Sequence, residues 1–317
     1  MPTVDPLPLE PLRRRGFAVA YRMLGSVADA EDLAQEALLR LTRADPRPDE
    51  PGAWITTVVT RLAIDELRSA RARRETYVGP WLPEPLLQDP AAGPADRVAL
   101  ADSLSQALLV ALELLSPTER AAFLLREAFG YDYARIATVL DRNEASCRQL
   151  VARARRQLAA RRPRFDPDEA HRDELLERFL AAAESGDLAA LEATLADDAV
   201  LVSDGGGKAV AARRPIVGAD RVARFMAGTA RKRHRWGTFT EERVRVNGQP
   251  GRLLRGPDDD GLWDVLSIDV VDGRITTVRI QRNPDKLAHL RAGGPDLRGR
   301  PSLSGATAAA SPGRRRR

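Results

Sequence analysis

The stretch YARIATVLDRNEASCRQLVARARRQLAA, residues 133–160, decides the fold of the first half of this chain. Its first part predicts a short amphipathic helix, because Ile136, Ala137 and Leu140 recur at the spacing of one helix face. The polar residues 141–143 predict a tight turn, and residues 144–160 predict a second helix. A short helix, a tight turn and a longer basic helix are typical of a helix-turn-helix that binds double-stranded DNA.

The second predicted helix has one apolar and one polar face. Cys147, Val151 and Ala154 belong to the apolar face, and we expect Cys147 to serve packing rather than redox sensing. The outward residues predicted to contact DNA are Ser146, Arg148, Gln149, Arg153, Arg155 and Arg156. Side chains near the start of such a helix reach base edges, and later arginines reach phosphates. The alternative is a surface helix with a solvated arginine face, but the preceding helix and turn favour DNA binding.

Basic residues are concentrated in two blocks. The chain has 317 residues and a formal net charge of +5. Eight arginines lie in residues 142–164 and five in residues 54–74, whereas residues 75–96 contain no Lys or Arg. Basic charge clustered in this way favours a nucleic-acid partner.

Metal, cofactor and membrane sites are not predicted. The chain has one cysteine, and its three histidines, His171, His234 and His289, show no ligand spacing. No apolar stretch reaches the length of a membrane span, and residues 1–11 lack an apolar signal core. We therefore expect a cytoplasmic protein without a cofactor, a metal site or a membrane partner.

The rest of the first half is also predicted to be helical. Residues 12–42 have an amphipathic helical pattern, residues 45–52 form a proline-rich loop, and residues 53–74 form a further helix. Five prolines in residues 77–96 predict a linker, and helices resume near Arg97.

Another helix start is marked by Ser116-Pro117-Thr118-Glu119. Serine can cap the helix, proline suits its first turn, and glutamate can complete a capping box. We expect three helices within residues 117–162.

The second half changes to an α+β pattern. Two short helices are predicted at residues 173–184 and 188–195, and a third at residues 219–229. Strands are predicted at residues 200–203, 208–212, 241–246, 253–255, 262–271 and 274–281. Asp272-Gly273 predicts a hairpin turn between the last two strands. The residues after 290 are rich in Gly, Pro, Ser, Ala and Arg, which predicts a disordered basic tail.

Three segments of the first half resemble extracytoplasmic-function sigma factors of RNA polymerase. Residues 54–69, WITTVVTRLAIDELRS, resemble the promoter-melting helix of that family. Residues 29–36, DAEDLAQE, are similar to its polymerase-binding segment. Residues 115–120, LSPTER, together with the helix-turn-helix, resemble its domain that reads the −35 element. The resemblance implies core RNA polymerase and promoter DNA as partners, the DNA double-stranded at −35 and melted at −10.

The resemblance also implies roles for particular residues. The loop 45–52 would hold a flipped base of the −10 element. The −10 residues would be Trp54, Arg61, Arg68, Arg71, Arg73 and Arg74. The family has Asn where Arg61 stands, so the base preference there is open. The polymerase contacts would be Asp29, Asp32, Gln35 and Glu36. The alternatives are a core anchor for Trp54, which we favour over base stacking, and a solvated face for the polar set on residues 29–36.

Three further segments resemble the sigma-J-like subgroup of that family. They are residues 77–85, YVGPWLPEP, residues 204–208, DGGGK, and residues 283–287, NPDKL. The subgroup carries a C-terminal cone-shaped α+β domain of the SnoaL-like (NTF2-like, cystatin-like) fold, which is thought to modulate activity in cis. The predicted domains are sigma region 2 (10–75), a linker (76–97), sigma region 4 (98–162), the SnoaL-like domain (170–290) and the tail (291–317).

We expect the linker to contact the two C-terminal segments. The interdomain residues would be Trp81, Leu82, Glu84, Asp204, Lys208, Asn283, Asp285 and Lys286. Glu84 would pair with Lys208 or Lys286. Because exposed ion pairs contribute only about 0–1 kcal/mol each, burial of Trp81 and Leu82 would supply most of the docking energy. The contiguous glycines do not fit a phosphate-binding loop and predict a tight turn.

Two other functions compete with a sigma factor. One is a repressor with a ligand-binding α+β domain, but a repressor needs neither the 29–36 nor the 54–69 segment. The other is a SnoaL-like enzyme, for which His234 and Asp269 are the candidate acid and base. We expect no enzymatic activity, and we expect a small ligand of unspecified chemistry in the C-terminal pocket.

Overall fold

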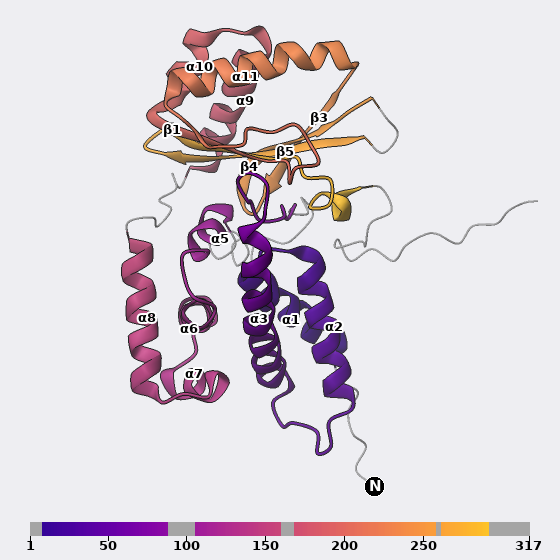
Figure 1. Ribbon diagram of the computed structural model, residues 1–317, viewed down its shortest axis with the longest axis vertical. Coiled ribbons are helices and arrows are strands. Elements are labelled where there is room, and N and C mark those ends of the chain that lie inside the picture. Colours follow the sequence, from indigo (N-terminus) through magenta and orange to yellow (C-terminus); the bar gives the residue numbers. More distant parts are fainter. Residues whose placement is uncertain (1–7, 88–104, 160–167, 258–260, 292–317) are drawn as a thin grey trace, which may run out of the picture.

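The computed structural model describes residues 8–87, 105–159, 168–257 and 261–291, without the side chains of residues 70–75. A helical half and an α+β half lie at opposite ends of the molecule, with an extended segment between them (Figure 1). The predicted helix restart near Arg97, most of the predicted tail, and the side chains of Arg71, Arg73 and Arg74 lie outside the described residues. None of the described helices is long and apolar enough to span a membrane.

The first helical unit consists of α1 (Leu9–Leu24), α2 (Val27–Thr42) and α3 (Pro51–Glu75). The prediction of one continuous helix over residues 12–42 is wrong, because the chain turns at Gly25, where φ is 67°. Ser26 then caps α2 by accepting from the Asp29 N–H at 3.3 Å. The positive φ at Gly25 ends α1 and lets α2 fold back beside it.

The second helical unit consists of α5 (Gln106–Leu112), α6 (Pro117–Glu127), α7 (Tyr133–Leu140) and α8 (Glu144–Ala159). Ser116 and Glu119 form the predicted capping box at the start of α6. Asp141, with φ of 51°, turns the chain between α7 and α8. Cys147 is buried between these helices, and burial raises the pKa of its thiol. Both observations fit the packing role predicted for it.

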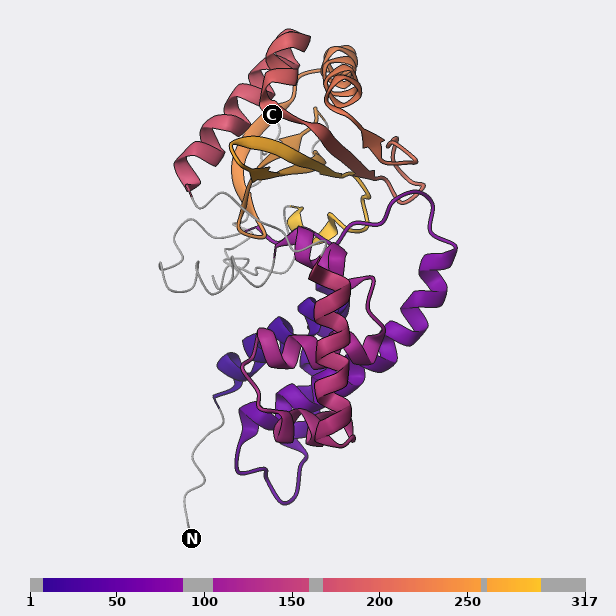
Figure 2. The same cartoon turned by 90° about the vertical axis from the view of Figure 1, so that its left-hand side faces the viewer.

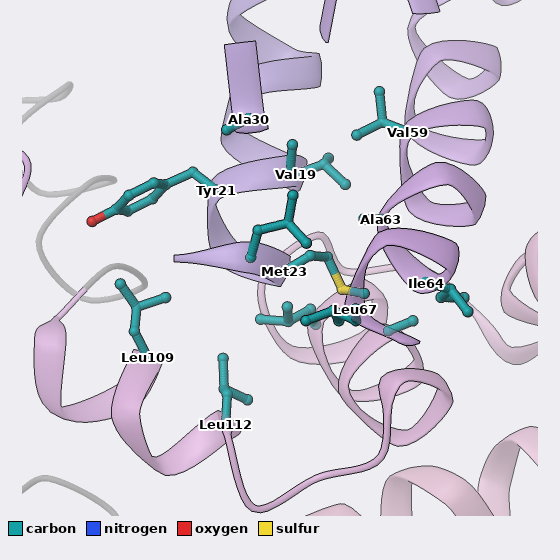
Figure 3. Close-up of a cluster of buried hydrophobic side chains, with 14 of the residues drawn as sticks. Val19, Tyr21, Met23, Ala30, Val59, Ala63, Ile64, Leu67, Leu109 and Leu112 are labelled. Atoms are coloured by element: carbon teal, nitrogen blue, oxygen red, sulfur yellow. The ribbon is translucent and has the colours of Figure 1, made fainter. Parts of the chain in front are cut away.

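The two helical units share one hydrophobic core. Side chains of α1 and α3, such as Met23 and Leu67, belong to the same buried cluster as Leu109 and Leu112 of α5. Figure 3 shows these residues of the two units converging on one another. The units therefore pack together through apolar surface, which is the main source of stabilisation in such an interface.

The α+β half contains α9 (Glu169–Ser185), α10 (Leu188–Thr194) and α11 (Ala219–Arg233), with strands β1 (Leu195–Asp204), β2 (Ile216–Val217), β3 (Thr240–Val246), β4 (Gln249–Arg255), β5 (Leu262–Val271) and β6 (Arg274–Gln281). The strand order is β2-β1-β6-β5-β4-β3, with β1 parallel to β6 and the other pairs antiparallel. The three helices lie on one side of the curved sheet (Figures 1 and 2). This is the expected cone-shaped SnoaL-like fold. Two 3-10 turns, His234–Trp236 and Ala288–Leu290, follow α11 and β6.

One predicted strand is absent and one predicted hairpin is present. Residues 208–212 are not a strand, because Gly206 and Gly207 have φ of 58° and 74° and the Ala209 N–H folds back onto the Gly205 carbonyl. The hairpin at Asp272-Gly273 is confirmed, since Val271 pairs with Arg274 and both turn residues have positive φ.

Candidate DNA interface and linker contact

Helix α8 presents a row of polar side chains to solvent. Its exposed residues include Arg148, Gln149, Arg153, Arg155 and Arg156, and Ser146 is half-buried. The opposite face is buried at Cys147, Val151, Ala154 and Leu158. The Ser146 N–H donates to Asn143 Oδ1 at 2.8 Å, which caps the start of the helix. The polar row is therefore accessible and held on a firmly docked helix.

Three of these arginines pair with carboxylates of their own domain. Arg148 lies 2.5 Å from Glu144, Arg153 lies 3.4 Å from Glu119, and Arg155 lies 2.6 Å from Glu127. All three guanidinium groups are more than half exposed, so each pair contributes little to stability. A phosphate could replace these carboxylates at low cost.

The predicted −10 residues lie along helix α3. Trp54 is half-buried and packs against the core, which agrees with a role as a core anchor. Arg68 is exposed and pairs with Asp65 at 2.9 Å. In the loop before α3, Asp45, Arg47 and Asp49 are exposed. The loop is therefore open to a partner, whereas the indole is largely engaged within the protein.

Arg61 joins the two helical units. Its Nε donates to the Val139 carbonyl at 2.9 Å and its Nη2 donates to the Thr138 carbonyl at 3.0 Å. Arg135 of α7 also pairs with Glu50, at the start of α3, at 3.0 Å. We call these bonds the α3–α7 contact. A side chain predicted for the −10 element thus binds the helix-turn-helix that is predicted for the −35 element.

The predicted polymerase-binding residues lie along α2. Asp32 and Gln35 are exposed, and Asp29 and Glu36 are half-buried. Glu36 pairs with Arg40 at 2.7 Å. A few residues on, Leu39 is also exposed, with half of its surface open to solvent. The helix therefore offers acidic, amide and apolar groups on one accessible surface.

Asp204, at the end of β1, is the centre of the contact between the linker and the α+β domain. Its side chain is fully buried. Oδ2 accepts from the Leu82 N–H at 2.8 Å and from Lys286 Nζ at 2.7 Å. Oδ1 accepts from the Tyr77 hydroxyl at 2.6 Å. We call Asp204, Lys286, Tyr77 and Leu82 the linker seat.

Further groups of the C-terminal segments complete the linker seat. Lys286 Nζ donates to the Leu82 carbonyl at 2.6 Å and lies 4.3 Å from the centre of the Trp81 ring. Asn283 Nδ2 donates to the Tyr77 hydroxyl at 2.9 Å. Desolvation and the hydrogen bond to Asp204 both raise the pKa of Tyr77, so its hydroxyl stays a proton donor. The structure thus brings together the three segments that the sequence singled out.

The linker is also bound by the first helical unit. The Glu84 N–H donates to the Gly25 carbonyl at 2.8 Å. Glu84 Oε2 accepts from the Val27 N–H at 2.6 Å, at the start of α2. Burial raises the pKa of Glu84, although the bond from the Val27 N–H favours its charged form. Residues 82–86 are therefore held by two domains at once.

The predicted partners of Glu84 are not those in the structure. Glu84 binds the start of α2, where the helix dipole favours a carboxylate. Lys286 pairs instead with Asp204, and Lys208 pairs with Asp285 at 2.5 Å on the surface. The sequence does not distinguish a carboxylate that will be buried from one that will be exposed. Opposite charge alone therefore could not assign these pairs.

The glycine turn of residues 205–207 packs against the linker. A Cβ atom on Gly206 would lie 2.2 Å from Asn283 Nδ2 and 3.0 Å from the Tyr77 hydroxyl. A Cβ on Gly207 would lie 3.2 Å from Val78. The close approach and positive φ together explain the glycines, and no phosphate site is needed to account for them.

Sequence reasoning missed Tyr21 and Asn247. The buried Tyr21 hydroxyl donates to the Glu84 carbonyl at 2.6 Å and accepts from Asn247 Nδ2 at 2.9 Å. Asn247 Oδ1 also accepts from the Leu86 N–H at 3.0 Å. Asn247-Gly248 is a recognisable hairpin-turn pair. That signal gives the turn but not its long-range partners.

A cavity of about 190 Å³ lies between the sheet and helices α9 and α11. Its lining does not include His234 or Asp269. His234 pairs with Glu184 on the surface, and Asp269 is buried beside Arg279 at 2.6 Å. The proposed acid and base are thus not brought together. Among the described residues, no group of three or more His, Cys, Asp or Glu is placed to hold a metal ion.

Comparisons with known proteins agree with this architecture. Residues 9–73 match sigma-70 region 2, and residues 105–158 match sigma-70 region 4. The chain is 41% identical over 286 residues to the ECF RNA polymerase sigma factor SigJ of Mycobacterium tuberculosis, covering 87% of this chain and 91% of that protein. It is 35% identical over 295 residues to a probable ECF sigma factor, SigI, of the same species, covering 91% and 97%.

The whole fold also resembles a solved structure. The crystal structure of M. tuberculosis SigJ superposes with a TM-score of 0.72 at 36% identity, covering 90% of this chain and 98% of that one. The helical units and the α+β domain thus occur together in both proteins. The chain belongs to the extracytoplasmic-function family of RNA polymerase sigma factors.

Proposed function

We propose that this sigma factor binds core RNA polymerase and directs promoter-specific initiation, and that its SnoaL-like domain controls the spacing of its two DNA-binding units in cis. As a member of the sigma family it is an initiation factor, not an enzyme. The observation that carries the regulatory part is the linker. Residues 82–86 are bound on one side by Gly25 and Val27 and on the other by Asp204 and Asn247.

The DNA contacts are assigned by exposure and charge. In the proposal, Ser146, Arg148 and Gln149 face base edges of the −35 element, because they lie at the start of α8. Arg153, Arg155 and Arg156 lie further along the helix and hold phosphates. Replacing any one of these three arginines by Gln should flatten the log–log salt dependence of DNA binding by roughly 0.9.

The melted −10 strand is assigned to the loop before α3 and to the arginines of α3. The exposed loop residues leave room for an unstacked base, and Arg61 and Arg68 supply cationic contacts to the strand. Trp54 supports this surface from the core side. In the same unit, the exposed residues of α2 around Asp32 and Gln35 are available for the polymerase.

The contact between the two helical units supports our proposal of a closed state, in which the two DNA-binding units are packed together. The −35 and −10 elements lie about 25 base pairs apart, or roughly 85 Å along B-form DNA. Arg61 and the helix-turn-helix are in hydrogen-bond contact, so the two readers cannot reach both elements of straight DNA together. Initiation therefore requires the two helical units to separate, with the α3–α7 contact broken and their shared core opened.

The SnoaL-like domain is placed to govern that separation. The linker that joins the two helical units is seated on this domain, and α5 also touches it, where the Ser267 hydroxyl donates to Gln106 Oε1 at 2.9 Å. Moving the linker seat would move both attachments. We further propose, as the sequence predicted, that the cavity of this domain holds a small ligand.

Run-off transcription with purified core polymerase tests the main proposal. We expect promoter-specific transcripts that require this protein. A repressor built on the same helix-turn-helix would bind DNA and give no initiation, which would refute the sigma function.

A double variant tests the regulatory part. Trp81→Ala with Leu82→Ala should enlarge the radius of gyration in small-angle scattering, because both side chains dock the linker. The control is Leu188→Ala with Val217→Ala, which removes two exposed apolar side chains of the α+β domain that lie outside the linker. Equal scattering curves for the two double variants would count against control through the linker.

A further inference from the structure

The cavity of the SnoaL-like domain has a mostly apolar wall. Leu180 and Phe225 come from the helices, Ile280 comes from the sheet, and Trp236 and Trp263 lie with ring centres 5.3 Å apart. The volume is about 190 Å³. Cavities of about 150 Å³ with apolar walls hold one benzene-sized molecule. This cavity can therefore hold a single ring, or a branched chain of similar size, with a short polar arm.

The charged groups of the wall are Glu184, Asp264 and four cations, of which Lys232 is exposed to solvent. Arg252 pairs with Asp264 at 2.9 Å and with Glu241 at 3.2 Å, so its charge is compensated. Arg233 likewise pairs with Glu184 and Glu241. These ion pairs close the wall without offering a free charge to a ligand.

Arg282 differs from those two arginines. Its Nη1 donates to the Val210 carbonyl, and its guanidinium lies 4.7 Å from the centre of the Trp263 ring. Its Nε is buried and has no hydrogen-bond partner within the described part of the chain. No ion pair of Arg282 with a carboxylate is found among the described residues. The guanidinium as a whole is half-buried, and the carboxylate whose charge acts on it, Asp264, is already paired with Arg252. An incompletely compensated cation on an apolar wall favours an anion as a further partner.

We infer that this cavity binds a small apolar carboxylate, with its ring or branched chain packed against Trp236, Trp263 and Phe225 and its carboxylate on Arg282. This inference deepens the proposed function, because it names the class of ligand for the C-terminal domain. A neutral ligand would leave Arg282 with only the charge of Asp264, which Arg252 shares, and a cationic ligand would be repelled by Arg282.

The same wall touches the linker seat. Ser203 lines the cavity, and its neighbour Asp204 holds the linker. Arg282 lines the cavity between Gln281 and Asn283, and Asn283 binds Tyr77. A carboxylate on Arg282 therefore acts one residue away from the groups that hold the linker, and binding should change the protection of the linker amides.

Binding is tested on the full chain with phenylacetate, benzoate and isovalerate and with the matching uncharged amides. Isothermal titration measures affinity, and tryptophan fluorescence reports occupancy beside Trp236 and Trp263. At least one acid should bind at least tenfold more tightly than its amide, the difference expected for a charge-assisted bond. If no acid binds at millimolar concentration, or if every acid binds no better than its amide, the inference is wrong.

Two arginine variants locate the carboxylate. Arg282→Gln should weaken binding of the acid roughly ten- to hundredfold and change binding of the amide little. Arg235→Gln removes an exposed arginine beside Trp236 and should leave both affinities unchanged. Equal loss in the two variants, or none in Arg282→Gln, would overturn the assignment. If Arg282→Gln does not fold, the comparison of acid and amide on the native chain decides.

The link to the linker has its own measurement. Hydrogen exchange at the Leu82 and Leu86 amides should change at least severalfold when the acid that binds is added, and unchanged exchange would refute the coupling. Ligand-independent run-off transcription tests the sigma function separately. A chain that initiates transcription but binds no acid therefore refutes this inference alone.

Discussion

The linker seat and the interface between the two helical units hold the same molecule together by different physical means. The linker seat is polar and buried: Asp204 is fully enclosed and accepts from Tyr77, Leu82 and Lys286. The interface of the helical units combines a shared apolar core with the exposed α3–α7 contact. The linker seat depends on directed hydrogen bonds, whereas the interface between the helical units depends mainly on buried apolar area.

This difference indicates which interface opens. Apolar burial is not directional, so another apolar surface, such as that of a polymerase, can replace it. The linker seat cannot be replaced so easily, because a buried carboxylate needs donors placed around it. We therefore expect the helical units to separate during initiation while the linker remains on the SnoaL-like domain.

The largest effect is expected at Asp204. Asp204→Asn removes the charge that pairs with Lys286 at 2.7 Å inside the protein. Breaking a buried ion pair costs roughly 3–5 kcal/mol, so the free energy of unfolding should fall by about that amount. Urea denaturation followed by circular dichroism measures the loss.

Asp285→Asn is the matched control for that variant. It removes the same charge from a pair with Lys208 in which both side chains are more than half exposed. The free energy of unfolding should fall by less than about 1 kcal/mol. Similar losses in the two variants would show that the linker seat is not a buried network.

A smaller loss is expected at Tyr21. Tyr21→Phe keeps the ring in the core but leaves the Glu84 carbonyl and Asn247 Nδ2 without their shared hydroxyl. Unsatisfied buried groups cost roughly 1–3 kcal/mol, so unfolding should become easier by that amount. The same denaturation experiment measures it, with Tyr133→Phe on the half-exposed Tyr133 as the control. Wild-type stability in Tyr21→Phe would mean that water replaces the hydroxyl.

The charge partner of Asp204 and the hydrogen bonds of Tyr21 lie beyond what the sequence could predict. Periodicity and caps predicted the helices of region 4 and the last two strands, because those signals are local. The segments of the linker seat could be singled out by resemblance, and their mutual contact followed. The partner of each charge could not be predicted, because Glu84 and Asp204 differ in burial and neighbours rather than in local sequence.

Two further errors have the same origin. The break between α1 and α2 was missed, because a single glycine within an amphipathic pattern does not reveal whether its φ is positive. The contribution of Tyr21 was missed, because a tyrosine on an apolar helix face predicts packing and not a hydrogen bond to a side chain 226 positions away. In both cases tertiary contacts decided the outcome.

The α3–α7 contact should prove weak where it is exposed. Arg135→Gln removes the pair with Glu50, whose carboxylate is largely open to solvent. The free energy of unfolding should change by less than about 1 kcal/mol, and the wild-type pair should weaken further as salt is raised. Denaturation at low and high salt measures both effects. A loss above about 2 kcal/mol would show that this contact is as firmly built as a buried pair.

The smallest expected effect is the pH response of His289. Its Nε2 lies 2.8 Å from the Pro85 carbonyl, and burial lowers the pKa of its imidazole. The unfolded chain therefore binds the proton more readily than the folded one, so the stability that His289 contributes is present above about pH 6.5 and is lost as the pH falls. Glu84 acts in the opposite sense, since its pKa is raised and its protonation favours the folded state.

His289→Gln can keep a donor to Pro85 without titrating, so comparing it with the wild type isolates the histidine. The melting temperature of the wild type should drop more between pH 7.5 and 5.5 than that of the variant, and parallel drops would mean that His289 does not contribute to the linker contact.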